Sequence, residues 1–353
     1  MKRSFDRRGW LDLGLGFVVG LVATGIAVAG LNAVMGWNRV GVWERAIDRR
    51  QADELEALMH RQINLASDGI DDEKPLLSGE KLAFSVTPAI YDHYLAYCIY
   101  LLEHGEVERF NQLRAETQYL RLDLSGVSLE GLNLEGADLQ GAILEDADFK
   151  GAALEGASFF RARLNGADFS GAQVDRTNFS QAEMLNVTLN HVTGTASDFS
   201  QAILVNASLT GITHLSGARF DYAELGQCNF EGSSFPEAVF DRADFTLAPA
   251  VNVDFSATQS MSDIVFTGAN LSGARWNHEK TERPWLVGSQ GLDGQTLRQL
   301  RANGGIFRPE ELLDLIDDEI VQGFRVQVEE NAEITEDQRE AVLFDLLRQY
   351  WMR

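Results

Sequence analysis

Cysteine, proline and basic residues are scarce in this chain of 353 residues. The 2 cysteines, Cys98 and Cys228, lie far apart, so neither a disulfide framework nor a cysteine-ligated metal site is indicated. Lysine and arginine number 30 against 53 aspartates and glutamates, which gives a formal net charge of -23. Binding to nucleic acid requires basic patches that displace counterions from phosphates, so this composition argues against direct binding to nucleic acid.

Motifs for catalysis and for cofactor binding are also lacking. The 6 histidines show no metal-ligand spacing with cysteine, aspartate or glutamate, and there is no glycine-rich loop of a phosphate or dinucleotide site. Asp92 and His93 form a lone adjacent pair, which is more typical of a surface than of a catalytic site. We therefore expect a protein that is not an enzyme and that uses no cofactor, no metal and no small-molecule substrate.

Large apolar residues recur at every fifth position from Leu124 to Trp276. A small or β-branched residue usually stands two positions before each of them, and glycine often stands two positions after. This period fits neither a helix of about 3.6 residues per turn nor a flat strand with a period of two. It requires a backbone that turns regularly and places one large and one small side chain inward at each turn, which indicates a solenoid.

A few positions break this rhythm. Gly194, Ala250 and Ser260 stand where a large apolar centre is expected, so each predicts a cavity or a local bulge. Six-residue steps precede Leu215 and Phe266, where one extra residue must loop out or shift the register. We interpret these breaks as structural irregularity, with binding sites as the alternative.

The sequence LNLEGADLQGA, at residues 132–142, resembles the pentapeptide-repeat family, whose unit is written A-(D/N)-L-x-x. The resemblance implies a mainly β fold, a right-handed quadrilateral parallel β-helix with four pentapeptides in each coil. Cys228 then occupies a small inward position, where a buried thiol serves as an apolar filler. Members of the family share an architecture rather than one activity, so the resemblance implies little about function.

The N-terminal part of the chain predicts a membrane anchor, a single transmembrane helix. No charged residue occurs from Leu13 to Asn38, and a tryptophan stands near each end of this run. The expected anchor side chains are Trp10, Leu13, Phe17, Leu21, Ile26, Leu31 and Trp37. The alternative is a cleaved export signal, because Arg7 and Arg8 resemble a twin-arginine signal and residues 27–29 fit a small-x-small cleavage site. We favour the retained anchor because the apolar run is longer than a usual signal core.

The orientation of this anchor is not decided by the flanking charges, because basic residues are equally frequent on its two sides. A short basic tail before a first span usually stays in the cytoplasm. We therefore expect a single-pass protein of the bacterial inner membrane, with the soluble part in the periplasm rather than in the cytoplasm.

Five regions follow from these patterns. They are a basic tail and transmembrane helix at 1–38, a helical stalk and linker at 39–86, a helical N-terminal cap at 87–120, the β-helix at 121–278, and a helical C-terminal cap or docking domain at 279–353. Residues 110–114, FNQLR, resemble the helical lead-in that often precedes a pentapeptide-repeat helix. A cap is physically required, because the first coil would otherwise expose the edges of parallel strands.

The C-terminal region predicts three short helices, over residues 294–302, 309–322 and 336–351, with a strand at 324–328. Thr335 and Gln338 have the spacing of a capping box before the last helix. The charged residues 279–284 are expected to end the repeats. We expect these helices to cap the last coil, and the alternative is that they dock on a partner through Leu343, Leu347 and Tyr350.

The outward positions of the repeats supply the remaining candidate contacts. Residues twenty apart are expected to stack on one wall, so Glu135, Glu155 and Asp175 predict an acidic column, and Asp148 and Asp168 predict another. The acidic wall either keeps the rod soluble or offers a negative surface to a basic partner. Three outward apolar residues are candidate contact sites: Phe160, Leu185 and Val205.

Three functions remain open from the sequence. The first is a membrane-anchored scaffold that presents a rigid acidic rod to a membrane-associated protein complex. The second is a DNA mimic, because some members of the family resemble duplex DNA and protect DNA gyrase. The third is an envelope spacer or stabiliser without a dedicated partner.

Overall fold

The computed structural model describes residues 57, 88–118, 120–314, 316, 318–331, 334–335 and 338–351. The chain divides into two compact units, Met1–Tyr100 and Leu101–Arg353. The predicted membrane segment, with Trp10, Trp37 and the anchor side chains between them, lies outside the described residues. Within the part that is described, no helix combines the length and the apolar character needed to cross a bilayer.

Two helices precede the repeats, α4 (Pro88–Glu103) and α5 (Val107–Glu116). The first begins at Pro88, and proline is favoured at the first position of a helix. Gly105 separates the two helices, and its φ of 67° is one that glycine adopts without strain. In α5, Phe110 and Leu113 are buried, which leaves the polar side of the helix free to meet the first coil.

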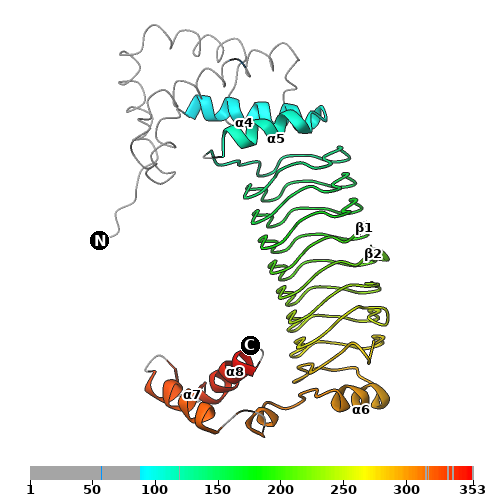
Figure 1. The fold of residues 1–353 in the computed structure, drawn as a ribbon, viewed down its shortest axis with the longest axis vertical. Coiled ribbons are helices and arrows are strands. Elements are labelled where there is room, and N and C mark those ends of the chain that lie inside the picture. Colours follow the sequence, from blue (N-terminus) through cyan, green and yellow to red (C-terminus); the bar gives the residue numbers. More distant parts are fainter. Residues whose placement is uncertain are drawn as a thin grey trace, which may run out of the picture. The chain divides into compact units, whose positions relative to one another are not determined.

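From Asp123 onward the backbone forms stacked coils joined by parallel bridges (Figure 1). Residues twenty apart pair, as Asp148 does with Asp168, so each coil consumes four pentapeptides. The N–H of Phe149 donates to the carbonyl of Asp168 at 2.7 Å, and the N–H of Asp168 donates to the carbonyl of Ala147 at 3.0 Å. The repeat period of five thus arises because each unit supplies one short ladder contact and one turn.

Two bridges lengthen into strands, β1 (Thr193–Thr195) and β2 (His214–Ser216), which pair in parallel with Gly194 opposite Leu215. This pairing spans twenty-one residues because the extra residue of the predicted insertion loops out at Thr213, which is exposed, before His214 pairs with Thr193. Gly194 fits this site because a Cβ atom there would lie 2.8 Å from the backbone N of Asp175. The register shift is confirmed, and the irregularity at Gly194 is a close backbone approach.

The interior of the rod is filled by the large apolar centres, whose phenylalanine rings stack from coil to coil. Stacked rings include the pairs 149–169, 159–179, 179–199, 199–220 and 220–240, with centroids 4.7, 5.0, 4.8, 4.9 and 4.8 Å apart. These spacings follow from the distance of about 4.8 Å between hydrogen-bonded strands. Phe149, Phe169 and Phe240 are fully buried, so the predicted inward orientation is confirmed.

Cys228 fills one of the small inward positions, as the sequence predicts. Its thiol donates a hydrogen bond to the carbonyl of Leu204 at 2.7 Å. Burial raises the pKa of the thiol to about 12, so the side chain remains a neutral filler at ordinary pH.

The predicted position of the second insertion is wrong by one repeat. Ser260 pairs with Val239 as a bridge residue, and the apolar centre of this repeat is the fully buried Met261. The six-residue step therefore runs from Phe255 to Met261, and the extra residue lies before Met261 rather than before Phe266. Sequence spacing fits either placement, and only Met261 fills the interior at this level.

The ladder also extends beyond the predicted end of the repeats. Val265 pairs with Trp285, and Trp285 pairs with Ile306. Residues 279–284 are charged, but Thr281 is fully buried and the N–H of Asp263 donates to the carbonyl of Glu282 at 2.9 Å. Because the ladder uses backbone groups, outward charges do not end it, and the boundary at residue 278 is too early.

The C-terminal elements are α6 (Gly294–Ala302), the 3₁₀ helix η3 (Pro309–Asp314), α7 (Asp318–Glu330) and α8 (Arg339–Trp351) (Figure 1). The helix predicted over 309–322 is divided between η3 and α7. The strand predicted at 324–328 is wrong, because these residues belong to α7. Val321 and Val328 are buried while Val326 is half exposed, so the apolar residues follow the helical spacing rather than a strand alternation.

Candidate interaction surface

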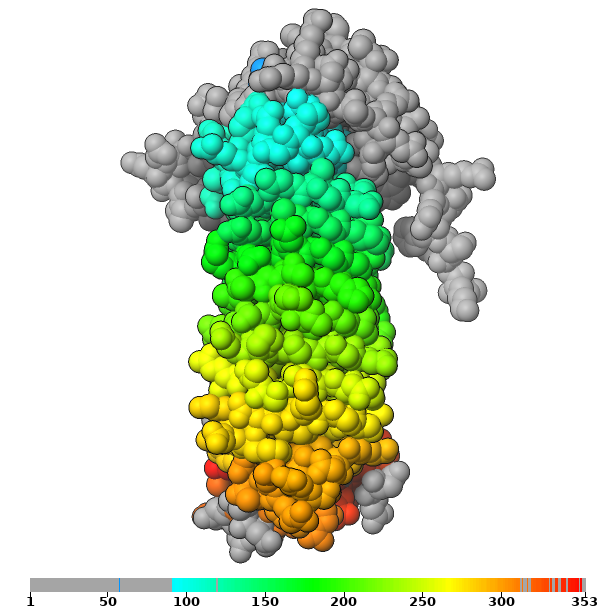
Figure 2. Space-filling view, turned by 90° about the vertical axis from the view of Figure 1, so that its right-hand side faces the viewer, coloured from blue at the N-terminus to red at the C-terminus, as the bar shows by residue number. Residues whose placement is uncertain are grey.

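The outer surface of the rod has four walls, and the coils form one continuous side in Figure 2. One wall carries the C-terminal helix, and we name it the α8 wall. Its bridge residues in successive coils are Arg163, Glu183, Ile203, Glu224, Asp244, Val265 and Trp285. The opposite wall is named the Gln173 wall, and its bridge residues include Ala153, Gln173, Thr193 and His214.

Aspartate and asparagine residues before the apolar centres hold the turns of the rod. Oδ1 of Asp168 accepts hydrogen bonds from the N–H of Ser170 at 2.9 Å and from its hydroxyl at 2.6 Å, and Asn178 accepts the same two bonds from Ser180. The residues that accept a bond from the N–H two positions later are Asp123, Asn133, Asp138, Asp148, Asp168, Asn178, Asp198, Asn229, Asp244, Asp254 and Asn270. Asparagine makes the same hydrogen bonds as aspartate at these positions, so the main role of these carboxylates is to hold the turns. Part of the acidic composition therefore has a structural cause.

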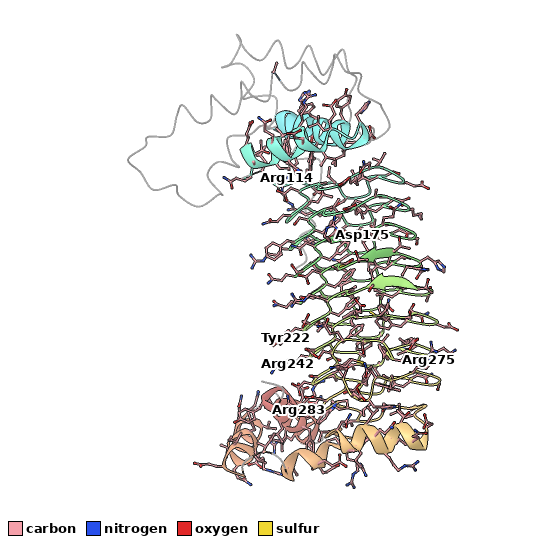
Figure 3. The ribbon with its side chains drawn as sticks, turned by 45° about the vertical axis from the view of Figure 1, so that its right-hand side comes forward. Arg114, Asp175, Tyr222, Arg242, Arg275 and Arg283 are labelled. Carbon is pink, nitrogen blue, oxygen red and sulfur yellow. The ribbon has the colours of Figure 1, made fainter. Side chains whose placement is uncertain are left out.

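The predicted column of Glu135, Glu155 and Asp175 lies on the Gln173 wall, but it is partly neutralised. Glu155 forms an ion pair with Arg176. Asp175 accepts hydrogen bonds from the N–H of Thr195 at 3.1 Å and from its hydroxyl at 2.9 Å. Figure 3 labels Asp175 on this wall. This column is therefore not an uninterrupted row of free negative charges.

Asp148 and Asp168 stack on a third wall with a lysine between them. Nζ of Lys150 lies 3.1 Å from Asp148 and 3.2 Å from Asp168. Burial would raise the pKa of Asp168, but the two hydrogen bonds from Ser170 and the Lys150 ammonium outweigh it and hold that pKa below its usual value. The second predicted acidic column is thus also a bridged pair.

A row of side chains runs along one corner of the rod, between the α8 wall and its neighbour. Its members adopt positive φ and include Arg161, Gln181, Gln201, Tyr222, Arg242, Asp263 and Arg283. The guanidinium of Arg242 lies 5.3 Å from the ring centroid of Tyr222, and its Nη1 donates to the tyrosine hydroxyl at 3.2 Å (Figure 3). Burial raises the pKa of Asp263 although the arginines on either side of it act to lower that pKa. Tyr222, in this corner row, is an exposed aromatic residue.

Leu185 and Val205 lie together on the α8 wall, in adjacent coils, and both are half-buried. Phe160 lies on a different wall, under the guanidinium of Arg161, which is 4.8 Å from its ring centroid. The three predicted apolar contacts therefore do not form one patch.

Leu343 and Leu347 are not surface residues, so the prediction that they bind a partner is wrong. Both are buried, at 4% and 0% exposure, in a cluster with Trp285 and Ile306. They hold α8 against a side wall of the rod. Tyr350 is 41% exposed and packs its ring near that of Phe324, with centroids 5.9 Å apart.

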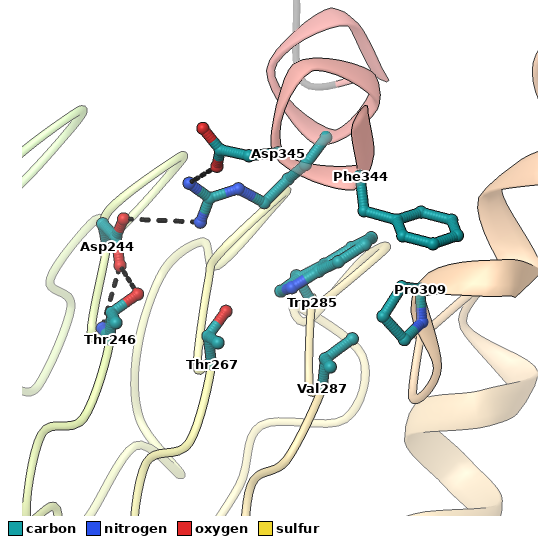
Figure 4. Close-up of a pocket in the computed structure, with 9 residues that line it drawn as sticks. Asp244, Thr246, Thr267, Trp285, Val287, Pro309, Phe344 and Asp345 are labelled. Atoms are coloured by element: carbon teal, nitrogen blue, oxygen red, sulfur yellow. Dashed lines mark hydrogen bonds and ion pairs between the residues drawn. The ribbon is translucent and has the colours of Figure 1, made fainter. Parts of the chain in front are cut away.

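A cavity of about 450 Å³ lies between α8 and the rod. Trp285, Phe344 and Pro309 line its apolar side (Figure 4). On its polar side, Arg348 of α8 lies 2.7 Å from Asp345 and 3.7 Å from Asp244 of the α8 wall. The α8 wall thus contacts α8 through one apolar region and one arginine–carboxylate pair.

Sequence reasoning missed Glu224, Asp244 and Trp285 as members of this wall. Their alignment depends on two shifts of one residue, one between Ile203 and Glu224 and one between Asp244 and Val265, with a spacing of twenty elsewhere. Applying both shifts to the period would have placed them together. The partner of Asp244, Arg348, has no sequence signal, because its position depends on how α8 folds back.

The sequence profile of the family described as Pentapeptide repeats matches the chain in 8 copies, over residues 123–159, 142–181, 157–193, 175–211 and 213–248. The matched residues lie within the coils formed by the parallel bridges, which continue beyond the match to Ile306. The chain therefore belongs to the pentapeptide-repeat family.

Several solved structures are similar to the chain. HetL, a protein involved in heterocyst differentiation regulation from the cyanobacterium Nostoc sp., shares 18% identity over 56% of this chain and 92% of its own, with a TM-score of 0.25. A protein of the Arabidopsis thaliana thylakoid lumen shares 33% identity over 32% and 67%, with a TM-score of 0.18. QnrB1, a plasmid-mediated fluoroquinolone resistance protein, shares 20% identity over 53% and 90%, with a TM-score of 0.22. The search of curated proteins gives no match.

Proposed function

We propose that this protein is a non-enzymatic scaffold, anchored to the bacterial inner membrane by its N-terminal segment, that binds a membrane-associated protein complex through the walls of its rod. The observation that carries the proposal is the filled interior. Its large centres from Leu124 to Phe266 are buried, so only the outer walls remain for interaction. Those walls are rigid because each turn is held by hydrogen bonds. A periplasmic location of the rod accords with the short basic tail before the apolar run.

The distribution of charge favours the scaffold over a DNA mimic. Glu155, Asp148 and Asp168 are paired with arginine or lysine, whereas a DNA mimic needs closely spaced free negative charges. A gyrase supercoiling assay with the full chain tests this choice. No effect at micromolar protein is expected, and inhibition or protection of gyrase would favour mimicry.

Two experiments test the scaffold itself. Membranes of the source cells are washed with carbonate, and the chain is expected to stay with the membrane fraction. The chain is then chemically crosslinked in those membranes, solubilised and purified, and the attached proteins are identified by mass spectrometry. A specific membrane assembly is expected, and recovery as a free monomer after crosslinking would contradict the proposal. Release of the chain by carbonate would contradict the membrane anchor in this proposal.

A further inference from the structure

Near the C-terminal end of the rod the α8 wall is covered by α8, whereas in the coils that precede this end the wall is accessible. Val265 and Trp285 are covered by the cluster that contains Leu343 and Leu347. In the coils above them, Ile203 and Val205 are half-buried and Glu224 is exposed. The same wall therefore continues from a closed helix interface into an accessible surface.

The open part repeats the chemistry of the occupied part. Glu224 pairs through the backbone ladder with Asp244, the residue that faces Arg348 of α8. Among the described residues, the Glu224 side chain forms no hydrogen bond or ion pair. Ile203, Leu185 and Val205 supply apolar surface in the coils above it, as Val265 and Trp285 do below.

The shape of the open part also suits a helix. Gly226 stands between Val205 and Thr246 on the wall, so no side chain projects from the wall at this position. Tyr222 and Leu247 are 52% and 57% exposed at the two borders of the wall. Coils repeat at about 4.8 Å and a helix has a pitch of about 5.4 Å, so successive helical turns can meet successive coils.

We propose that the open part of the α8 wall, centred on Leu185, Val205 and Glu224, binds an amphipathic α-helix of a partner protein. The apolar side of that helix lies on Leu185, Ile203 and Val205. One arginine or lysine of the helix pairs with Glu224 as Arg348 pairs with Asp244. This inference rests on the proposed function, because it names the wall and the kind of partner that the scaffold uses.

The test uses a peptide whose chemistry is already shown to fit this wall. A fluorescent peptide with the sequence of residues 336–351 is titrated with the full chain, and its anisotropy is measured. Saturable binding is expected, and Glu224→Lys is expected to weaken it at least about tenfold by placing like charges together. A peptide with glutamate in place of Arg348 is expected to bind more weakly by the same factor. Gln173→Lys, which places a lysine on the opposite wall, is expected to bind like the unmodified chain.

The binding position is mapped with a photoreactive group on the peptide. Crosslinks to residues 183–226 are expected. Crosslinks to residues 244–287 would mean that the peptide replaces α8, and this result would overturn the proposal. Lack of saturation at about millimolar peptide would overturn it as well. Leu185→Ser provides an independent variant, because it removes apolar contact without a change of charge, and unchanged affinity in this variant would contradict the proposed contact.

Failure of this inference is distinguishable from failure of the scaffold. If the membrane assembly crosslinks to the chain but only through the Gln173 wall, the scaffold stands and the helix site is wrong. If no assembly is found on any wall, the proposed function fails first.

Discussion

The side chain of Asn111 in α5 accepts the hydrogen bond from the backbone of Asp138 that a preceding coil would otherwise accept. Its Oδ1 accepts a hydrogen bond from the N–H of Asp138 at 2.8 Å, and its Nδ2 donates to the carbonyl of Gly136 at 2.9 Å. Deeper in the rod, the N–H of the equivalent Ser158 donates to a backbone carbonyl, that of Ala137, at 2.9 Å. Arg114 adds a bond to the carbonyl of Gln140 at 2.9 Å. The helix thereby satisfies a strand edge that would otherwise be open to another chain.

Replacement of Asn111 by alanine is expected to weaken this cap. Two hydrogen bonds to the first coil disappear, so the free energy of unfolding falls by about 1–3 kcal/mol. The exposed edge also favours association between rods. Chemical denaturation and light scattering after size exclusion measure both effects. Gln112→Ala is the control, because the side chain of Gln112 bonds to Glu116 within α5. An equal loss in both variants would refute the capping role.

Replacement of Phe199 by alanine is expected to be among the most damaging changes in the rod. The ring stacks between Phe179 and Phe220 at 4.8 and 4.9 Å and is fully buried. A cavity at this position costs about 3–5 kcal/mol of unfolding free energy. Leu247→Ala, at a side chain that is 57% exposed, serves as the control and is expected to change it by less than about 0.5 kcal/mol. Similar effects of the two changes would contradict the stacked interior.

Asp168 is expected to tolerate asparagine but not alanine. Asparagine keeps the bonds to Ser170, as Asn178 does with Ser180, and loses only an exposed ion pair with Lys150, worth at most about 1 kcal/mol. Alanine loses the turn as well, for a total cost of about 1–2 kcal/mol. Thermal unfolding at pH 7 compares the three proteins. Equal stability of the alanine and asparagine variants would show that the side chain does not hold the turn.

The lowered pKa of Asp168 predicts that the free energy of unfolding depends on pH. The folded-state pKa of Asp168 lies below its usual value of 3.8, so the unfolded chain takes up the proton first as the pH falls. The stabilisation is therefore complete above the unfolded pKa and disappears as the pH falls through the folded one. Unfolding free energies from pH 7 down to acid are expected to converge for wild type and Asp168→Asn. A difference that persists at the lowest pH would contradict this assignment.

Gly194 and Gly171 are expected to respond differently to alanine. At Gly194 a Cβ atom would lie 2.8 Å from the backbone of Val174 and Asp175, and such overpacking costs about 1–3 kcal/mol. At Gly171 nothing lies within 4 Å, and only the positive φ of 69° opposes alanine, at about 1 kcal/mol. Differential scanning calorimetry of the two variants measures the order, and the reverse order would contradict the close approach of the coils at Gly194.

Much of the fold is predictable because each repeat makes its own contribution to the core. The period places Phe149 and Phe169 inward without knowledge of any distant residue. The choice between Ser260 and Met261 was not predictable from spacing, because it depends on which side chain fills the interior of one coil. The ladder through Trp285 was missed for a related reason, since backbone pairing continues under outward charges.

The candidate site was predictable only in part. The twenty-residue spacing correctly brought Leu185 and Val205 together, but Leu343 and Leu347 turned out to be buried. An apolar helix side has the same pattern whether it packs on its own rod or on a partner. That distinction depends on the return of α8 to the wall, which places Arg348 beside Asp244.

The most direct test of the account is photocrosslinking in native membranes. A photoreactive amino acid replaces Val205 on the α8 wall in one full-length chain and Gln173 on the opposite wall in another. The account predicts one membrane-associated protein crosslinked at position 205, through a helical segment that carries arginine or lysine, and no such product at position 173. Crosslinks only at position 173, or only to lipid or to a second copy of this chain at position 205, would contradict it.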